Sequence, residues 1–204
     1  MSDTEETEVL EETEVEEASP EEMAAALGAL MNPANEPRVI GIFGDINEEN
    51  SSAACGAMLA FSKLASEPIE VFLSTNGGSA DEMYGIVDTM RYLQSQDCEI
   101  HVMGVGKIMS AGVLILASGT KGKRKIGKNT RLMLHPIQGG STGSFVDMKD
   151  DISIMQKMQE KYIKSLVEVS SLTYRELKKI VNKRFDTYFT AEEAVEMGLA
   201  DEIF

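Results

Sequence analysis

The sequence contains no tryptophan and has only two cysteines and two histidines among its 204 residues. Cys55 and Cys98 lie in apolar stretches typical of small buried side chains, which argues against a disulfide and fits a reducing cytoplasm. Two histidines without close Cys or His spacing do not predict a structural zinc site. No apolar run reaches the roughly 18 residues that a membrane-spanning helix needs. We therefore expect a cytoplasmic protein without a metal and without a membrane partner.

Basic residues are missing from positions 1–37, which hold twelve of the 34 acidic residues. The net charge of −15 is therefore concentrated at the start of the chain, and residues 38–204 carry only −3. Nucleic-acid binding needs a basic face, so we expect none. We predict that residues 1–37 form an acidic, largely disordered extension with one short helix from Ala24 to Met31, and that residues 38–204 form the folded domain. Whether the extension is a propeptide or a docking arm remains open.

Apolar strand-like and helix-like segments alternate from Val39 onwards. This alternation predicts an α/β fold with a mainly parallel sheet and right-handed crossovers. A long amphipathic helix of about 20 residues follows, whose apolar positions include Met155 and Tyr162, and capping boxes at Thr173 and Thr190 begin two further helices. The expected strands are 39–43, 69–73, 99–103, 124–126, 131–135 and 201–204, and the expected helices in the first half are 50–65 and 79–93.

Ser110 lies where a glycine-containing loop meets the apolar segment Ala111–Ala117. Backbone N–H groups at the beginning of a helix are unpaired and carry partial positive charge. A serine at this point can act as a nucleophile, with the N–H of the next residue as an oxyanion donor beside it. The pattern therefore suggests a serine hydrolase.

A nucleophilic serine needs a base and a group that orients the base. His135 ends an apolar strand, at the edge of a parallel sheet where ligand sites gather. Asp186 lies between aromatic residues just before the capping box at Thr190. His101, in the middle of a strand, is more simply interpreted as a structural residue.

Familiar catalytic motifs are absent. Ile108 stands two residues before Ser110, where a Gly-x-Ser-x-Gly elbow requires glycine, and the order Ser, His, Asp differs from that of the common triad enzymes. No Walker A, His-Glu-x-x-His or dinucleotide-binding fingerprint occurs. We therefore expect no cofactor.

Four segments, in this order and with similar spacing, resemble the proteolytic subunit of Clp protease from about Val39 to Phe204. They are 76–78 (Asn-Gly-Gly), 106–110 (Gly-x-x-x-Ser), 131–135 (Arg-Leu-Met-Leu-His) and 186–201 (Asp-Thr-Tyr-Phe-Thr-Ala-Glu-Glu-Ala through Gly-Leu-Ala-Asp).

This resemblance implies an ATP-dependent Clp-type serine endopeptidase, with a ClpP/crotonase-like fold of stacked strand–helix–strand units and a protruding handle helix. Its triad would be Ser110 as nucleophile, His135 as general base and Asp186 as orienter. The N–H groups of Gly78 and Ala111 would form the oxyanion hole. The backbone of Gly139, Gly140 and Ser141 would bind an unfolded substrate by strand addition.

The family also assembles as two stacked seven-membered rings, which implies a homo-oligomer that encloses the active sites. Residues 1–37 do not resemble the family's pore loop and first helix, which help to dock an AAA+ unfolding ATPase, so this partner and the ring number remain open. Ile108 and Met109 are bulkier than the small residues usual before the serine. This bulk motivates one alternative to the peptidase, a catalytically silent ring or scaffold subunit that joins an active paralogue. A second alternative, from the related fold, is a crotonase-type acyl-CoA enzyme.

Overall fold

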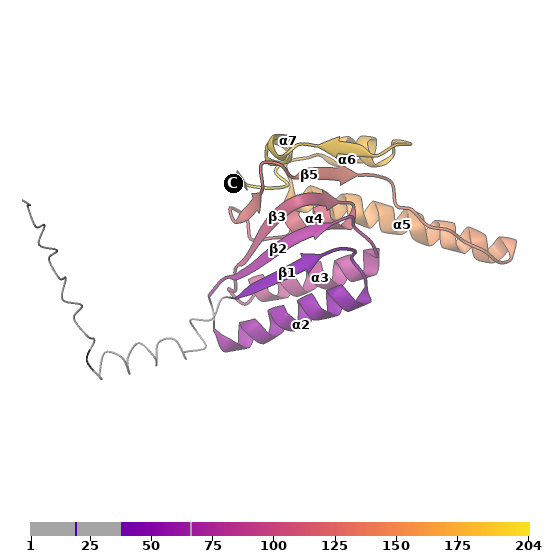
Figure 1. Cartoon of the computed structure of the whole chain (residues 1–204). Helices are drawn as coiled ribbons and strands as arrows, with labels where there is room; N and C mark the ends of the chain where they lie inside the picture. The colour runs from indigo at the N-terminus through magenta and orange to yellow at the C-terminus, as the bar shows by residue number, and fades with distance from the viewer. Residues whose placement is uncertain (1–18, 20–37, 66) are drawn as a thin grey trace, which may run out of the picture. The chain divides into compact units, whose positions relative to one another are not determined.

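A computed structural model of the chain describes Ser19, residues 38–65 and residues 67–204 (Figure 1). The predicted acidic extension and the helix from Ala24 to Met31 lie outside the described residues, so the division of the chain at residue 37 stays a prediction. No helix among the described residues is long and apolar enough to cross a membrane.

The sheet is mostly parallel, as the alternating segments predict. Its main path runs β1–β2–β3–β4–β7, and every pairing along that path is parallel. The members of this path are β1 (Val39–Phe43), β2 (Ile69–Thr75), β3 (Ile100–Met109), β4 (Arg124–Ile126) and β7 (Glu202–Ile203). The predicted α/β fold class is confirmed.

Strand β3 is longer than predicted. We expected a strand over 99–103 followed by a loop, but β3 continues through Gly106 to Met109. Its first half pairs with β4 and its second half with β5 (Arg131–Leu134). Ser110 therefore follows a strand directly, and this strand is held in place by a neighbour that lies more than 20 residues further along the chain.

Strand β6 (Thr187–Phe189) was not predicted. It pairs antiparallel with β5, outside the main path of the sheet. Three residues flanked by polar positions carry too weak a pattern to predict a strand, and the pairing depends on contact with a distant segment. This antiparallel pair brings the segment that follows Asp186 beside the segment that precedes His135.

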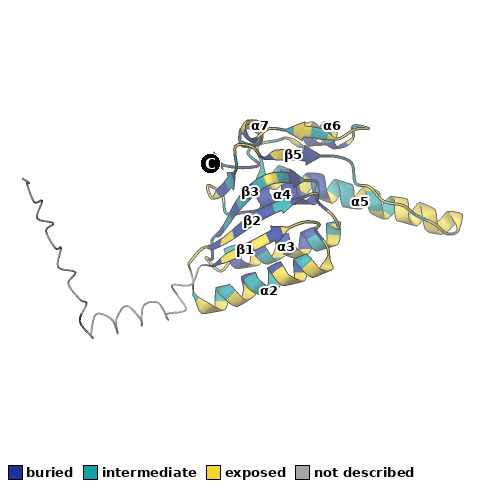
Figure 2. Ribbon diagram, in the orientation of Figure 1, coloured by how far each residue is buried: buried dark blue, intermediate teal, exposed yellow. Residues whose placement is uncertain are grey.

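Helices α2 (Glu48–Leu64) and α3 (Ala80–Gln94) lie together on one face of strands β1–β3 (Figure 1). Both begin at residues that accept a backbone N–H on the side chain, Asn47 for α2 and Ser79 for α3. Helix α4 (Ala111–Ala117) has all seven residues buried, so the segment that begins at Ser110 passes through the core of the domain (Figure 2).

Helix α5 (Phe145–Val169) is 25 residues long, somewhat longer than predicted. Its C-terminal half packs on the domain through Tyr162, Ile163 and Leu166, whereas its N-terminal half extends away and is exposed (Figure 2). The helices α6 (Tyr174–Val181) and α7 (Ala191–Glu196) begin at the two predicted capping boxes, both of which are formed.

A buried ion pair fixes the end of the chain against β4. The Arg124 side chain is almost fully buried and binds the Asp201 carboxylate through two of its nitrogens, while its third nitrogen donates to the carbonyls of Ala117 and Val169. Burial by itself would raise the pKa of the Asp201 carboxyl, but the hydrogen bonds from Arg124 and from the N–H of Gly122 outweigh burial and hold this pKa below its ordinary value.

Candidate active site

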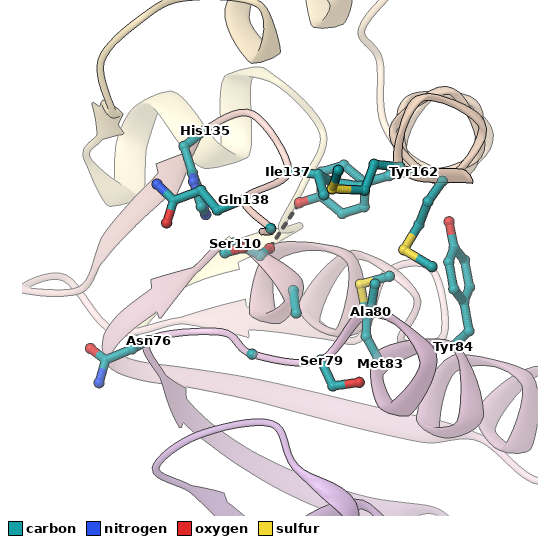
Figure 3. A pocket seen from close by; sticks show the side chains of 15 residues that line it. Asn76, Ser79, Ala80, Met83, Tyr84, Ser110, His135, Ile137, Gln138 and Tyr162 are labelled. Carbon is teal, nitrogen blue, oxygen red and sulfur yellow. Dashed lines mark hydrogen bonds between the residues drawn. The ribbon is translucent and has the colours of Figure 1, made fainter. Parts of the chain in front are cut away.

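A cavity of about 410 Å³ lies at the edge of the sheet where β2, β3 and β5 end (Figure 3). Ser110 and His135 both line it, so the structure brings the predicted nucleophile and base into one space. The walls come from the turn after β2, the first turns of α3, the start of α4, the segment after β5 and one side of α5. The lining residues are Asn76, Gly78, Ser79, Ala80, Met83, Tyr84, Ser110, Ala111, His135, Ile137, Gln138, Gly139, Met155, Met158 and Tyr162.

Ser110 has a strained backbone, with φ 54° and ψ −118°, between the end of β3 and the first residue of α4. A non-glycine residue at positive φ costs free energy and persists only where its surroundings hold it. The Ser110 N–H donates to the carbonyl of Met133 on β5 at 2.8 Å. The hydroxyl makes no capping hydrogen bond to the helix that it precedes, and is therefore available for other chemistry.

Two glycines allow this turn to lie close to its neighbours. A Cβ on Gly77, where φ is +96°, would lie 2.6 Å from Ser110 Cβ and 3.1 Å from Ser110 Oγ. A Cβ on Gly112 would lie 2.3 Å from Thr75 Cγ2. Contacts under 3.0 Å require displacement, so glycine at both positions is what lets the strand–turn–helix unit approach β2. The close approach at Gly77 sets the position of the serine side chain itself.

The two predicted oxyanion donors have suitable backbone surroundings. The carbonyl of Gly77 and the N–H of Ser79 both bond to Ile46, in the pattern of a parallel bridge. The N–H of Gly78 between them therefore points away from Ile46. Ala111 is the first residue of α4, and the first N–H groups of a helix have no partner within the helix. Both residues line the cavity beside Ser110.

His135 and Asp186 come directly after the last registered pair of β5 and β6. The last registered partners are Leu134 and Thr187, and the next residues outwards in an antiparallel ladder are His135 and Asp186. No hydrogen bond joins these two side chains within the described part of the chain: Nδ1 of His135 is buried without a partner, while Asp186 is exposed and is not part of the cavity wall. The structure thus brings Ser110 and His135 into one cavity, and places Asp186 next to it in register.

The predicted substrate segment lies at the mouth of the cavity. Gly139 lines the cavity, while Gly140 and Ser141 do not, and the Ser141 hydroxyl bonds to the Asp151 carboxylate on α5. No strand is assigned to residues 135–144 in this single chain. Strand addition of a peptide at Gly139–Ser141 therefore stays a prediction.

His101 has the structural role expected for it. Its Nε2 lies 2.7 Å from the Glu99 carboxylate, away from the cavity. The hydrogen bond from His101 lowers the pKa of the Glu99 carboxyl. No group of three or more Asp, Glu, Cys or His side chains suitable for a metal ion occurs in the described ranges.

Several cavity residues were not predicted as part of a site. Met155 and Tyr162 were predicted only as apolar positions of the long helix. Met155 and Met158 form an apolar wall of the cavity together with Met83. Tyr162 donates its hydroxyl to the Ser110 carbonyl at 2.8 Å (dashed line in Figure 3). Helical periodicity identifies the face of a helix that is buried, but not which neighbouring residue that face meets.

Ile108, one of the two bulky residues before the serine, does not obstruct the cavity. Its side chain is fully buried, packs against Gly104 and is absent from the cavity wall. Ile108 therefore fills the core beneath the site, which weakens the original reason to suspect a silent subunit.

Comparison with known proteins gives a consistent result. The family model described as Clp protease matches residues 22–204. The ATP-dependent Clp protease proteolytic subunit 2 of Gluconobacter oxydans is 30% identical over 168 residues, which cover 82% of this chain and 74% of that protein. Subunit 3 from a Synechococcus strain is also 30% identical over 168 residues, covering 81% and 82%. Among solved structures, a ClpP1 point mutant from Listeria monocytogenes superposes with a TM-score of 0.74 at 24% identity, covering 82% of this chain and 91% of that one.

Proposed function

We propose, from the premise that this chain belongs to the Clp protease family, that it is a serine endopeptidase in which Ser110, His135 and Asp186 form the triad. Family membership supports the coarser statement that the chain is a Clp-type peptidase, a hydrolase. The observation that carries the finer proposal is the strained Ser110, whose hydroxyl is uncommitted and shares a cavity with His135 and with two backbone donors.

In the proposed reaction, the Ser110 hydroxyl attacks a peptide carbonyl and passes its proton to Nε2 of His135. The carbonyl oxygen becomes an oxyanion, held by the N–H groups of Gly78 and Ala111. Loss of one such donor typically costs about 3 kcal/mol of barrier. His135 then protonates the leaving amine, the C–N bond breaks, and an acyl-enzyme on Ser110 remains. Water, deprotonated by His135, hydrolyses that ester and restores the serine.

Asp186 would orient the imidazole by accepting a hydrogen bond from Nδ1 of His135. Its place opposite His135 in the β5–β6 register supports this role, as does the buried Nδ1 without another partner. The carboxylate must turn from its exposed position toward the ring for the triad to form.

The substrate class follows from the cavity walls. Met83, Met155 and Met158 offer flexible apolar surface beside the nucleophile, which suits a long apolar side chain of an unfolded protein or peptide. The backbone of Gly139, Gly140 and Ser141 would hold the substrate in extended form by strand addition. No cofactor is required for this chemistry.

Helix α5 supports the proposal of a homo-oligomer. Its projecting half leaves large apolar side chains exposed, and a patch of this kind marks an interface. These residues are Phe145, Val146, Met148, Ile152 and Ile154. We take the family's stacked seven-membered rings as the expected assembly. Dependence on ATP through an AAA+ unfoldase, the cytoplasmic location and the role of residues 1–37 stay predictions.

The test uses the full chain, a fluorophosphonate probe and a fluorogenic peptide. Wild-type protein should be labelled on Ser110 and should cleave the peptide, whereas Ser110→Ala should lose both activities and keep the same oligomeric mass. Normal peptide turnover by Ser110→Ala would refute the proposed nucleophile. A wild-type protein that resists the probe, yet joins an active homologous subunit in a mixed ring, would favour the silent subunit. Stabilisation by coenzyme A would favour the acyl-CoA enzyme.

A further inference from the structure

The peptide group between Ser110 and Ala111 has two ends with different uses. Its N–H belongs to Ala111 and is one of the proposed oxyanion donors. Its C=O belongs to Ser110 and accepts two hydrogen bonds, from the Tyr162 hydroxyl at 2.8 Å and from the Val113 N–H at 3.0 Å. Because a trans peptide is planar, its C=O and N–H point in opposite directions. Whatever holds the Ser110 carbonyl therefore also aims the Ala111 N–H.

Helix formation by itself does not hold this peptide firmly. Ser110 precedes the first helical residue and has φ 54° and ψ −118°, outside the helical region. Its carbonyl accepts from the N–H three residues ahead, a tighter bond than the regular helical one. A strained residue of this kind stays in place only where further contacts over-determine it. The bond from Tyr162 is such a contact, and it comes from a helix 52 residues further along the chain.

Tyr162 is well suited to act as a permanent donor. Its side chain is only 6% exposed and is fixed in the packed half of α5, between buried neighbours such as Ile163 and Leu166. Burial, and to a lesser extent the nearby Tyr84, raise the pKa of the Tyr162 hydroxyl. The hydroxyl is therefore protonated at every pH where a serine peptidase works. A hydroxyl that stays protonated keeps donating this hydrogen bond throughout the reaction.

We infer that Tyr162 is a positioning residue for the oxyanion hole: its hydroxyl holds the Ser110 carbonyl and thereby directs the Ala111 N–H into the cavity. This inference rests on the proposed peptidase function. The hydrogen bond also polarises the peptide, which strengthens the opposite N–H as a donor to a developing negative charge. The effect should be felt in the transition state more than in substrate binding, because only the transition state carries the oxyanion.

The test replaces Tyr162 by phenylalanine in the full chain, which removes one oxygen and keeps the ring in its packed place. Rates are expressed per site that reacts with fluorophosphonate, so that any unfolded fraction does not count. For Tyr162→Phe we expect kcat for a fluorogenic peptide to fall about tenfold with KM unchanged, the scale of one hydrogen bond to a buried carbonyl. The acid limb of the pH–rate profile, which reports the catalytic base, should not move.

A second measurement separates the oxyanion hole from general packing. A peptide boronic acid forms a tetrahedral adduct on the serine, with one oxygen where the oxyanion develops. Tyr162→Phe should weaken this inhibitor about tenfold and leave the affinity for a non-covalent product peptide unchanged. The matched control is Tyr174→Phe. It removes a hydroxyl on α6 that donates to the Glu160 carboxylate on α5 at 2.6 Å, and neither residue lines the cavity. It should behave like the wild-type protein in all of these assays.

The outcomes are distinct. An unchanged kcat in Tyr162→Phe, or equal losses for the boronic acid and the product peptide, would overturn the inference while the proposed function stands. A rise in KM alone would overturn it too, since the hydroxyl would then serve substrate binding. If the wild-type protein neither reacts with fluorophosphonate nor cleaves the peptide, the proposed function itself fails and the inference falls with it.

Discussion

Replacing Gly77 by alanine should disable the site through a single methyl group. The new Cβ would lie 2.6 Å from Ser110 Cβ and 2.9 Å from the Met109 carbonyl oxygen. Ordinary van der Waals contact begins at 3.4 Å, so the serine turn or the Gly77 turn must move by about 0.8 Å. The φ of +96° at this position adds strain of about 1–2 kcal/mol for a residue with a Cβ. Because Gly78, a proposed oxyanion donor, directly follows Gly77, movement of either turn changes the geometry between that donor and Ser110.

The expected magnitude follows from that displacement. A shift of about 1 Å in a reacting group costs on the order of a hundredfold in rate. We therefore expect Gly77→Ala to lower kcat/KM for a fluorogenic peptide at least a hundredfold and to lower the free energy of unfolding by about 1–3 kcal/mol. Fluorophosphonate labelling should slow in parallel, because this probe requires the same serine position.

Gly56→Ala is the matched control for Gly77→Ala, because it adds the same methyl group away from the site. Gly56 lies in the interior of α2, is exposed and has no other described group within 4 Å of where a Cβ would be. Gly56→Ala should stabilise the fold by up to about 1 kcal/mol through helix propensity and leave peptide cleavage unchanged. If Gly77→Ala cleaved the peptide as fast as Gly56→Ala, with a similar unfolding midpoint, the proposed role of the close approach to Ser110 would be refuted.

Two further predictions concern carboxylates. Asp186→Asn should lower kcat for the fluorogenic peptide about 10⁴-fold with little change in KM, because an amide no longer orients the imidazole in the required tautomer. A loss of less than tenfold would exclude Asp186 from the triad. Asp201→Asn should lower the free energy of unfolding at pH 7 by about 3 kcal/mol, because it leaves the buried Arg124 unpaired. The pKa of Asp201 is lower in the folded state than in the unfolded one, so its stabilisation is complete above about pH 4 and is lost as the pH falls through the folded-state value. Urea unfolding should therefore show the two proteins converging as the pH is lowered below 4, and a constant difference would contradict this explanation.

Much of the fold could be predicted because its signals are local. Apolar runs separated by helical patterns indicated the parallel sheet, and the side-chain caps at Thr173 and Thr190 marked two helix starts correctly. Strand β6 and the second half of β3 were missed, since each depends on pairing with β5, a segment distant in the chain. Local propensity carries little information about such partners.

The sequence could predict some residues of the candidate site but not others, for the same reason. His135 and Gly78 follow strands that the sequence predicts, and the carboxyl ends of parallel strands meet at one edge of a sheet, so their approach to one another could be predicted. Ser110 follows the second half of β3, which was not predicted, so its place beside them was expected only from the family resemblance. The role of α5 could not. Its periodicity predicted that Met155 and Tyr162 face inwards, but not that they face the cavity.

The sequence by itself determined the family, the α/β class and the order of the chemical groups at the sheet edge, because these depend on residue identity and on spacing along the chain. Tertiary structure alone decided three things: the strained backbone at Ser110, the fit of Gly77 against that serine, and the bond from Tyr162 to the Ser110 carbonyl. The last two are contacts between segments far apart in sequence, and the backbone of Ser110 is itself held by hydrogen bonds to such segments, at Met133 and Tyr162. Such contacts are set by how helices and strands pack in three dimensions, which no local pattern specifies.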